Sequence, residues 1–246
     1  MNRDILLRGG LVIDGSGRPG EIADVAVRDD RIAAVGRSLP AGSARTINAE
    51  GLAVAPGFID IKTHSDFTLP INPKAESKVR QGVTSEIVGH CGYSVAPILP
   101  GNLDMIRDYL NASAPWLPFR ETTFREYLSG FPQTSVNAGM LVGHHTLRLN
   151  VMGMDARPPS GAELDHMTAL LEEGLAAGAL GLSSGLFTPP SSYANRAEMV
   201  SLCNVLKRRN AGYFTHLRDE SNNVIAASSE EDAGRAAIPM TFRRSV

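Results

Sequence analysis

The stretch Ala55-Pro56-Gly57-Phe58-Ile59-Asp60-Ile61-Lys62-Thr63-His64 decides the fold prediction, because the character of the sequence changes there. Before it, residues 1–58 alternate apolar and polar residues with a period of two, and clusters of Gly, Asp and Pro interrupt the alternation. This pattern is typical of short strands joined by turns. We therefore expect a small all-β unit over residues 1–58.

After that stretch, residues 59–246 alternate strand-like runs with longer helical segments, which predicts a parallel sheet with crossover helices. In the segments Gly161–Ala177 and Arg196–Arg209, apolar residues recur every three or four positions, so one face of each helix would pack on the sheet. Six strands are fewer than the eight that close a TIM-type barrel, which usually takes about 250 residues. The sequence therefore predicts an α/β fold with an incomplete (β/α)8 barrel. The expected strands are Phe58–Ile61, Thr84–Val88, Asn137–Val142, Ala179–Leu182, Gly212–Thr215 and Ile238–Phe242.

The composition limits the classes of partner. Of the 246 residues, 43% are hydrophobic and 20% are charged, and the formal net charge is -2 without a polybasic run. These values indicate a globular protein with small-molecule partners, and they argue against binding to nucleic acid or to membranes. Because the sequence shows no signal-like apolar core and no run of about 20 apolar residues, we expect a cytoplasmic protein. The two cysteines are too few for a disulfide scaffold.

Two glycine motifs suggest other chemistries. Gly15-Ser16-Gly17-Arg18-Pro19-Gly20 matches the dinucleotide pattern GxGxxG, but a strand follows where that site needs a helix, so we expect a hairpin turn. Gly181-Leu182-Ser183-Ser184-Gly185 matches the GxSxG elbow of serine hydrolases, which must also open a helix. The residues after it are extended and contain Pro189-Pro190. A serine hydrolase that uses Ser183 stays open as a lesser alternative.

Histidine and cysteine residues suggest a metal site. His64, Cys91 and His216 each lie at or just past the C-terminal end of an expected strand, which is the face where parallel β/α barrels assemble their sites. Neutral imidazole and thiolate are preferred ligands of Zn²⁺, and a catalytic zinc keeps one position open for water. The pattern predicts a zinc site at this face. Three polar residues at strand ends without a ligand role remain the alternative.

Longer strings resemble a known family. Residues 55–66, a strand that ends in His64, resemble the first-strand signature of the amidohydrolase superfamily. Residues 75–94, which end in Gly89-His90-Cys91-Gly92-Tyr93-Ser94, resemble its N-acyl-D-amino-acid deacylase (D-aminoacylase) branch. Three later strings, residues 141–144, 178–186 and 215–220, are similar to the same branch. The resemblance covers nearly the whole chain and matches the N-terminal portion of that family.

This resemblance implies a small β-sandwich segment followed by a distorted (β/α)8 barrel, divided at residues 1–58 and 59–246. It also implies zinc-assisted hydrolysis of the amide C–N bond of an N-acyl-D-amino acid, a small-molecule substrate. By position, Cys91 and His216 would be zinc ligands, and His64 would be the surviving histidine of an HxH pair. A bridging thiolate from Cys91 would replace the carboxylated lysine of other amidohydrolases. Ser183, Tyr193 and Arg218 are candidates for substrate binding.

Two departures from the family pattern qualify that expectation. Lys62 occupies the place of the first histidine of the HxH pair, and a protonated ammonium cannot donate a lone pair to Zn²⁺, so we expect a weakened metal position. The family's general-base aspartate and one histidine ligand have no counterpart here, and we expect the base beyond the C-terminus. The leading hypothesis is thus a deacylase by descent that is truncated and inactive, and the alternative is a non-catalytic fragment that binds zinc.

Overall fold

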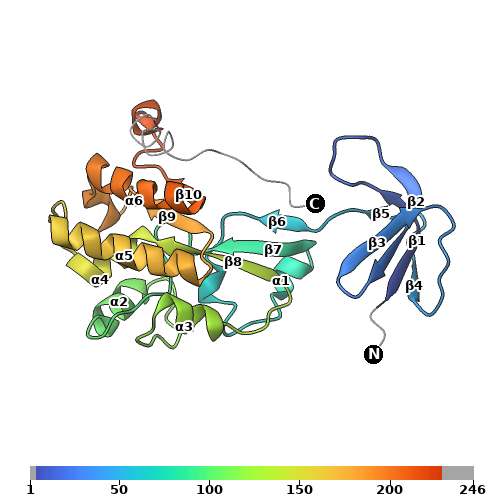
Figure 1. Ribbon diagram of the computed structural model, residues 1–246, viewed down its shortest axis with the longest axis horizontal. Coiled ribbons are helices and arrows are strands. Elements are labelled where there is room, and N and C mark those ends of the chain that lie inside the picture. Colours follow the sequence, from blue (N-terminus) through green and yellow to red (C-terminus); the bar gives the residue numbers. More distant parts are fainter. Residues whose placement is uncertain (1–3, 229–246) are drawn as a thin grey trace. The chain divides into compact units, whose positions relative to one another are not determined.

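The computed structural model describes residues 4–228, and two separate sheets organise them (Figure 1). The chain divides into two compact units between Phe58 and Ile59. No helix within residues 4–228 is long and apolar enough to cross a membrane.

The first unit contains one sheet of five strands. Its strands are β1 (Ile5–Val12), β2 (Glu21–Arg28), β3 (Arg31–Gly36), β4 (Arg45–Asn48) and β5 (Ala53–Val54), in the order β3-β2-β1-β4 with β5 also paired to β1. β1 and β2 are antiparallel, whereas β4 and β5 run parallel to β1. The expected short strands are present and form one sheet, and the sandwich that the family resemblance implies stays a prediction.

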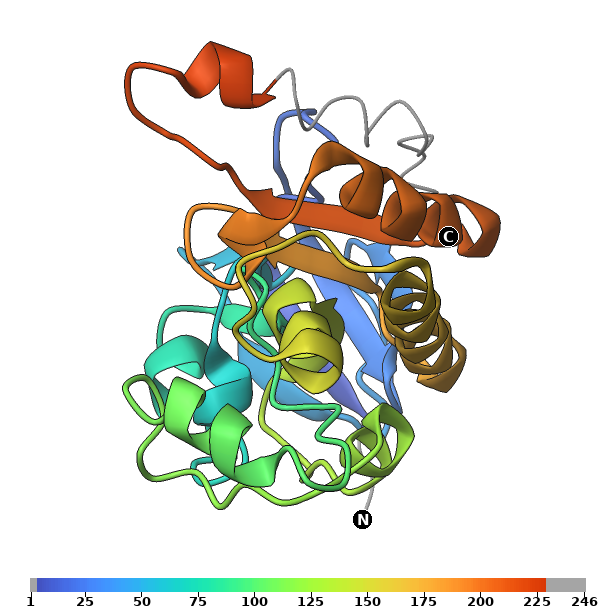
Figure 2. The ribbon, with the colours of Figure 1, turned by 90° about the vertical axis from the view of Figure 1, so that its left-hand side faces the viewer.

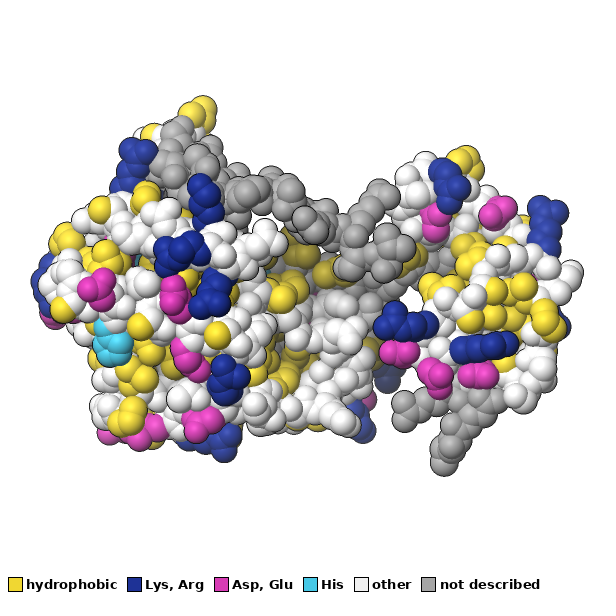
Figure 3. All heavy atoms as spheres, in the orientation of Figure 1, with side chains coloured by type: hydrophobic (Ala, Val, Ile, Leu, Met, Phe, Trp, Pro, Cys, Tyr) yellow, Lys and Arg dark blue, Asp and Glu magenta, His cyan; other side chains and the backbone are white. Residues whose placement is uncertain are grey.

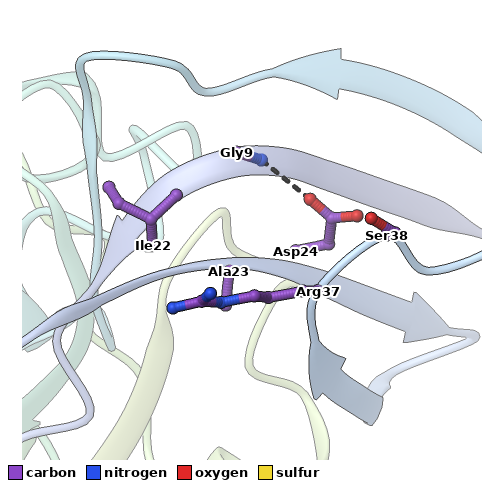
Figure 4. Close-up of a pocket in the computed structure, with 6 residues that line it drawn as sticks. All are labelled: Gly9, Ile22, Ala23, Asp24, Arg37 and Ser38. Atoms are coloured by element: carbon purple, nitrogen blue, oxygen red, sulfur yellow. Dashed lines mark hydrogen bonds between the residues drawn. The ribbon is translucent and has the colours of Figure 1, made fainter.

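Many apolar side chains of this sheet are exposed. The exposed fractions are 55% for Ile22, 69% for Ile32 and 51% for Val35. Figure 3 shows apolar side chains gathered over this unit. A hollow of about 380 Å³ on the same unit (Figure 4) is lined by Gly9, Ile22, Ala23, Asp24, Arg37 and Ser38. The carboxylate in this hollow already accepts hydrogen bonds from the backbone N–H groups of Gly9 (2.9 Å) and Leu39 (3.0 Å), so its role is structural.

The second unit is a curled parallel sheet, one part of a TIM-type barrel. Its strands lie in chain order: β6 (Phe58–Asp60), β7 (Val83–Val88), β8 (Asn137–Gly143), β9 (Gly181–Gly185) and β10 (Gly212–His216). The pairs β7–β8, β8–β9 and β9–β10 are parallel. The predicted incomplete (β/α) barrel is therefore confirmed. The sixth expected strand, Ile238–Phe242, lies outside the described residues.

Helices connect the strands of this sheet. The α-helices are α1 (Glu76–Val79), α2 (Leu103–Leu110), α3 (Phe124–Ser129), α4 (His144–Met152), α5 (Gly161–Ala177) and α6 (Arg196–Arg209), with 3₁₀ turns η1 (Ser65–Phe67) and η2 (Ser191–Tyr193). Figure 2 shows α5 and α6 beside each other, and both pack on the sheet. α5 and α6 have the predicted bounds, because Ser160 and Asn195 cap their first turns and Gly178 and Asn210 end them in left-handed conformations.

The main core lies between the sheet and these helices. Val142 of β8, Leu182 of β9, Leu171 of α5 and Leu202 of α6 are all fully buried there. Gly174 of α5 allows the helix to approach closely, since a Cβ at this position would stand 2.6 Å from Cγ2 of Val142. The core thus fixes the position of the sheet, and functional residues are expected at the ends of its strands.

Candidate functional site

The C-terminal ends of the parallel strands form one edge of the sheet, which we call the C-terminal edge. Cys91 follows β7 by three residues, and His216 is the last residue of β10. Gly185, the last residue of β9, pairs with His216. A side chain at Gly185 would overlap the carbonyl of Cys91, so Cys91 packs directly on the end of β9. The fold therefore brings Cys91 and His216 to adjacent positions on this edge.

Cys91 lies in a tight turn, residues 89–92, which we call the Cys91 turn. Three of its residues have positive φ: Gly89 (78°), Cys91 (55°) and Gly92 (83°). The N–H of Tyr93 donates to the carbonyl of His90 at 2.9 Å and closes the turn. At Gly92 a Cβ would overlap the ring of His145, so this position needs glycine for space as well as for φ.

The Cys91 thiol is half-buried and lies among charged groups. Burial raises its pKa above the ordinary value, the charge of Lys62 acts to lower it, and Glu220 acts to raise it further. Lys62 and Glu220 therefore both lie near enough to the Cys91 thiol to change its pKa. Lys62 is exposed, so solvent and salt screen part of its ammonium charge.

The two histidines of the edge are partly solvent-accessible. His64 follows β6, and burial, the charge of Lys62 and His216 together lower its pKa, which favours the neutral imidazole that a metal requires. The ring of His216 stacks on Phe187 with centroids 6.0 Å apart, and its Nε2 lies 3.5 Å from Oε1 of Glu220. His216 is thus near enough to His64 to help lower the pKa of His64.

The donors at this edge meet only part of what a zinc ion requires. Thiolate and imidazole are the right ligand types, and a catalytic zinc takes three protein ligands. Within residues 4–228, no three His, Cys, Asp or Glu side chains lie close enough together to hold a metal. The described part of the chain therefore brings zinc-type donors to one edge but does not form a complete zinc site.

Ser183 faces the Cys91 turn and has no exposed surface. Its hydroxyl accepts a hydrogen bond from the N–H of Gly92 at 3.0 Å and donates one to the carbonyl of Gly89. The residues after β9 do not begin an α-helix, so the strand–turn–helix arrangement of a serine-hydrolase elbow is not formed around Ser183.

Arg218 follows β10 and contacts the loop between β9 and α6, which carries Tyr193. The guanidinium of Arg218 donates to the carbonyls of Ser192 (2.9 Å) and Ala194 (3.0 Å). Tyr193 lies in η2 of this loop and is partly buried. The two residues therefore lie together, and Arg218 holds the backbone that carries Tyr193.

A buried polar network, which the sequence patterns did not reveal, supports the same loop. Nε2 of His144 lies 2.8 Å from Oε1 of Glu198, and the guanidinium of Arg148 donates to both carboxylate oxygens of Glu198 at 2.9 and 2.6 Å. All three side chains are fully buried. The hydroxyl of Ser191 contacts Nδ1 of His144 at 2.8 Å and Nδ1 of His145 at 3.0 Å.

His145 connects this network to the edge. Burial lowers its pKa to about 3, so its imidazole is neutral. Its ring stacks on Tyr93 with centroids 4.6 Å apart, and its Nε2 contacts the backbone oxygen (3.1 Å) and hydroxyl (3.0 Å) of Thr188. The first seven residues of α4 are all buried, charged ones included, and no pattern in the sequence signals this burial.

Comparisons with known proteins agree with this architecture. No family model matches the chain. It is 42% identical over 234 residues to N-acyl-D-aspartate deacylase of Alcaligenes xylosoxydans xylosoxydans, an alignment that covers 92% of this chain and 46% of the relative. The crystal structure of a D-aminoacylase that defines a subset of amidohydrolases superposes with a TM-score of 0.84 at 40% identity, covering 95% of this chain and 49% of that one.

A second solved structure contains a metal. N-acyl-D-glutamate deacylase from Bordetella bronchiseptica, complexed with zinc and a phosphonate inhibitor that mimics the tetrahedral intermediate, superposes with a TM-score of 0.82. It is 36% identical, and the match covers 95% of this chain and 49% of that one. The chain thus spans about half the length of the relatives that it matches.

Proposed function

This chain belongs to the D-aminoacylase group of the amidohydrolases, and from that premise we propose that it contributes to zinc-dependent hydrolysis of the amide C–N bond of N-acyl-D-amino acids. The observation that carries this proposal is the packing of Cys91 against the end of β9, beside His216. The zinc complex of the related N-acyl-D-glutamate deacylase supports the choice of metal.

In this proposal Cys91, His216 and His64 would hold zinc, which requires them to move closer together than they lie within residues 4–228. When bound, zinc lowers the pKa of a coordinated water towards 7 and polarises the amide carbonyl. Lys62 opposes binding on the β6 side because its ammonium charge faces the same edge, so the metal would depend most on Cys91 and His216. Arg218 and Tyr193 would serve the substrate through the β9–α6 loop, whose carbonyls Arg218 holds.

A second candidate function is zinc binding without catalysis. Two observations favour it over catalysis: Lys62 stands at the edge, and within residues 4–228 the three protein ligands that a catalytic zinc takes do not come together. The two candidates differ in whether a zinc-loaded chain releases a free D-amino acid.

Zinc content tests the proposal first. We expect the purified chain to hold about one zinc ion per molecule by elemental analysis and the Cys91→Ala variant to lose most of it. Cys203→Ala is the matched control, because Cys203 is fully buried in the core and away from the edge. A folded chain without zinc would refute both candidate functions.

An activity assay then separates the two candidates. The zinc-loaded chain is incubated with N-acetyl-D-glutamate, N-acetyl-D-aspartate and N-acetyl-D-leucine, and the free amine is measured. Amine release that is lost in Cys91→Ala and kept in Cys203→Ala supports the deacylase. Zinc binding with no release of amine supports the non-catalytic candidate.

A further inference from the structure

The Cys91 turn holds its cysteine in a conformation that most residues avoid. Cys91 has a φ of 55°, in the left-handed region, and glycines with positive φ stand at positions 89 and 92. A non-glycine residue in this region persists only where its surroundings determine the backbone strongly.

The backbone groups on both sides of Cys91 converge on one hydroxyl. The N–H of Gly92 donates to Oγ of Ser183 at 3.0 Å, and the same hydroxyl donates to the carbonyl of Gly89. The bonds join β9 to a turn that lies 91 residues earlier in the chain. One side chain therefore spans the turn from its first residue to its last.

The strand geometry explains why Ser183, and not Ser184, has this task. Successive side chains on a strand point to opposite faces. Leu182 points into the helix-covered core, so Ser183 points to the inner face of the curled sheet, where the Cys91 turn lies. Ser184 points away again, and its hydroxyl bonds to the hydroxyls of Tyr213 (2.7 Å) and Thr215 (2.9 Å).

The opposite side of the turn is fixed independently. The carbonyl of Gly92 accepts hydrogen bonds from the N–H groups of His145 (2.9 Å) and Thr146 (3.4 Å). Within residues 4–228, Ser183 is the hydrogen-bonding partner of the remaining two groups, the N–H of Gly92 and the carbonyl of Gly89. Removing its hydroxyl would leave both without that partner, in a buried place where water cannot readily replace it.

We propose that Ser183 is a positioning residue for Cys91: its hydroxyl bridges Gly89 and Gly92 and so holds the Cys91 thiol at the C-terminal edge. The proposal rests on the proposed function in one respect: the reason for holding Cys91 in place is that it serves as a metal ligand. It assigns to the serine of the GxSxG string a role in shaping the site, where a hydrolase elbow would use that serine as the nucleophile.

Hydrogen exchange of one amide tests the bridge directly in the unaltered full chain. The N–H of Gly92 donates to Ser183, whereas the nearby N–H of Ser94 donates to the hydroxyl of Thr146 at 3.1 Å. We expect both amides to be protected in the wild-type chain by NMR-detected exchange. In Ser183→Ala the protection of Gly92 should fall at least tenfold, while that of Ser94 stays within threefold.

Thiol reactivity tests the consequence for Cys91. With a chelator present, so that no metal masks the thiol, the rate of reaction of Cys91 with 5,5′-dithiobis(2-nitrobenzoate) should change at least fivefold in Ser183→Ala. Ser184→Ala, which removes a buried hydroxyl one residue away, should leave the rate within twofold. Cys203 is fully buried and does not obscure the signal in folded protein.

Three outcomes would overturn the proposal. An unprotected Gly92 amide in the wild-type chain overturns the proposal even if Ser183→Ala does not fold. Equal effects of Ser183→Ala and Ser184→Ala on the thiol overturn it too, because they indicate a general loss of packing. Labelling of Ser183 by a fluorophosphonate would identify a nucleophile and refute the bridge. None of these measurements involves zinc or deacylase activity, so failure of the proposed function leaves them unchanged.

Discussion

Glu198 balances the buried positive charge of Arg148 beneath the C-terminal edge. It is fully buried between His144 and Arg148. Burial alone would raise the pKa of its carboxyl, and the hydrogen bonds and charges of His144 and Arg148 bring that pKa below the ordinary value. The carboxylate is therefore ionised in the folded chain, and it compensates a buried guanidinium.

Replacing Glu198 with Gln should therefore destabilise the fold. The variant leaves Arg148 as an uncompensated buried charge, and breaking a buried pair in this way typically costs about 3–5 kcal/mol. Urea denaturation at pH 7 measures the free energy of unfolding. Glu172→Gln is the matched control, because Glu172 pairs with Arg208 at 2.9 Å on the surface, where such a pair contributes about 0–1 kcal/mol. Equal losses in both variants would contradict this assignment.

The same carboxyl predicts a dependence on pH. Its pKa is lower in the folded chain than in the unfolded chain, so its contribution is fully present above the unfolded pKa, about 4.3, and is lost as the pH falls through the folded value. The titratable His144 and the charged Arg148, both of α4, are the groups that face it. We expect the difference in unfolding free energy between wild type and Glu198→Gln to be constant from pH 7 to 5 and to shrink below pH 4. A difference that stays unchanged down to the acid unfolding of the wild type would refute the argument.

At the residue scale, a local rule predicted where three residues lie, and their role as metal ligands stays a prediction. His64, Cys91 and His216 could be selected because each follows a strand, and the parallel sheet does place the three at one edge. The Ser183 bridge and the Glu198 network could not be predicted, because their hydrogen bonds join residues 91 and 50 positions apart. Sequence periodicity says nothing about which side chains meet over such separations.

At the scale of helices and strands, local signals define the helices better than the strands. α5 and α6 begin and end where Ser160, Gly178, Asn195 and Asn210 provide caps, and the predicted bounds were correct. β9 was expected at Ala179–Leu182 but spans Gly181–Gly185. Ala179 and Leu180 are still connected to the end of α5 and to β8 by hydrogen bonds, so the ladder with β10 starts later.

Two effects compete when Gly174 of α5, which packs on the sheet, is replaced by Ala. Ala is a better helix former than Gly by about 1 kcal/mol, so propensity alone predicts that Gly174→Ala stabilises the fold. The new Cβ would stand 2.6 Å from Cγ2 of Val142, and overpacking of this kind costs about 1–3 kcal/mol. We expect net destabilisation in thermal unfolding. Gly161→Ala, on the same helix with no atom within 4 Å of the new Cβ, should not destabilise. A more stable Gly174→Ala would show that the helix can move away from the sheet.

At the scale of the whole molecule, the two sheets differ in how completely they are covered. The parallel sheet has helices packed on one face and an interior turn network on the other, whereas apolar residues of the first sheet remain exposed. The order of elements could be predicted from the change in pattern near Gly57. The missing cover could not, because periodicity identifies an apolar face but not the partner that packs against it.

The strand β6 lies at an exposed edge of the parallel sheet. It is a terminal strand of the five-stranded sheet in the described residues, and Phe58, Ile59 and Ile61 are 68%, 63% and 63% exposed. A sheet edge with apolar side chains favours pairing with another chain. We therefore expect concentration-dependent self-association of the purified chain between about 1 and 100 μM, measured by light scattering coupled to gel filtration. Ile59→Lys should reduce it by adding a charge to the edge, and Ile32→Lys, which changes an exposed apolar residue of the first sheet, distinguishes the two surfaces. Association that falls only in Ile32→Lys would assign the contact to the first sheet, and a wild-type chain that stays monomeric throughout would show that neither surface drives assembly.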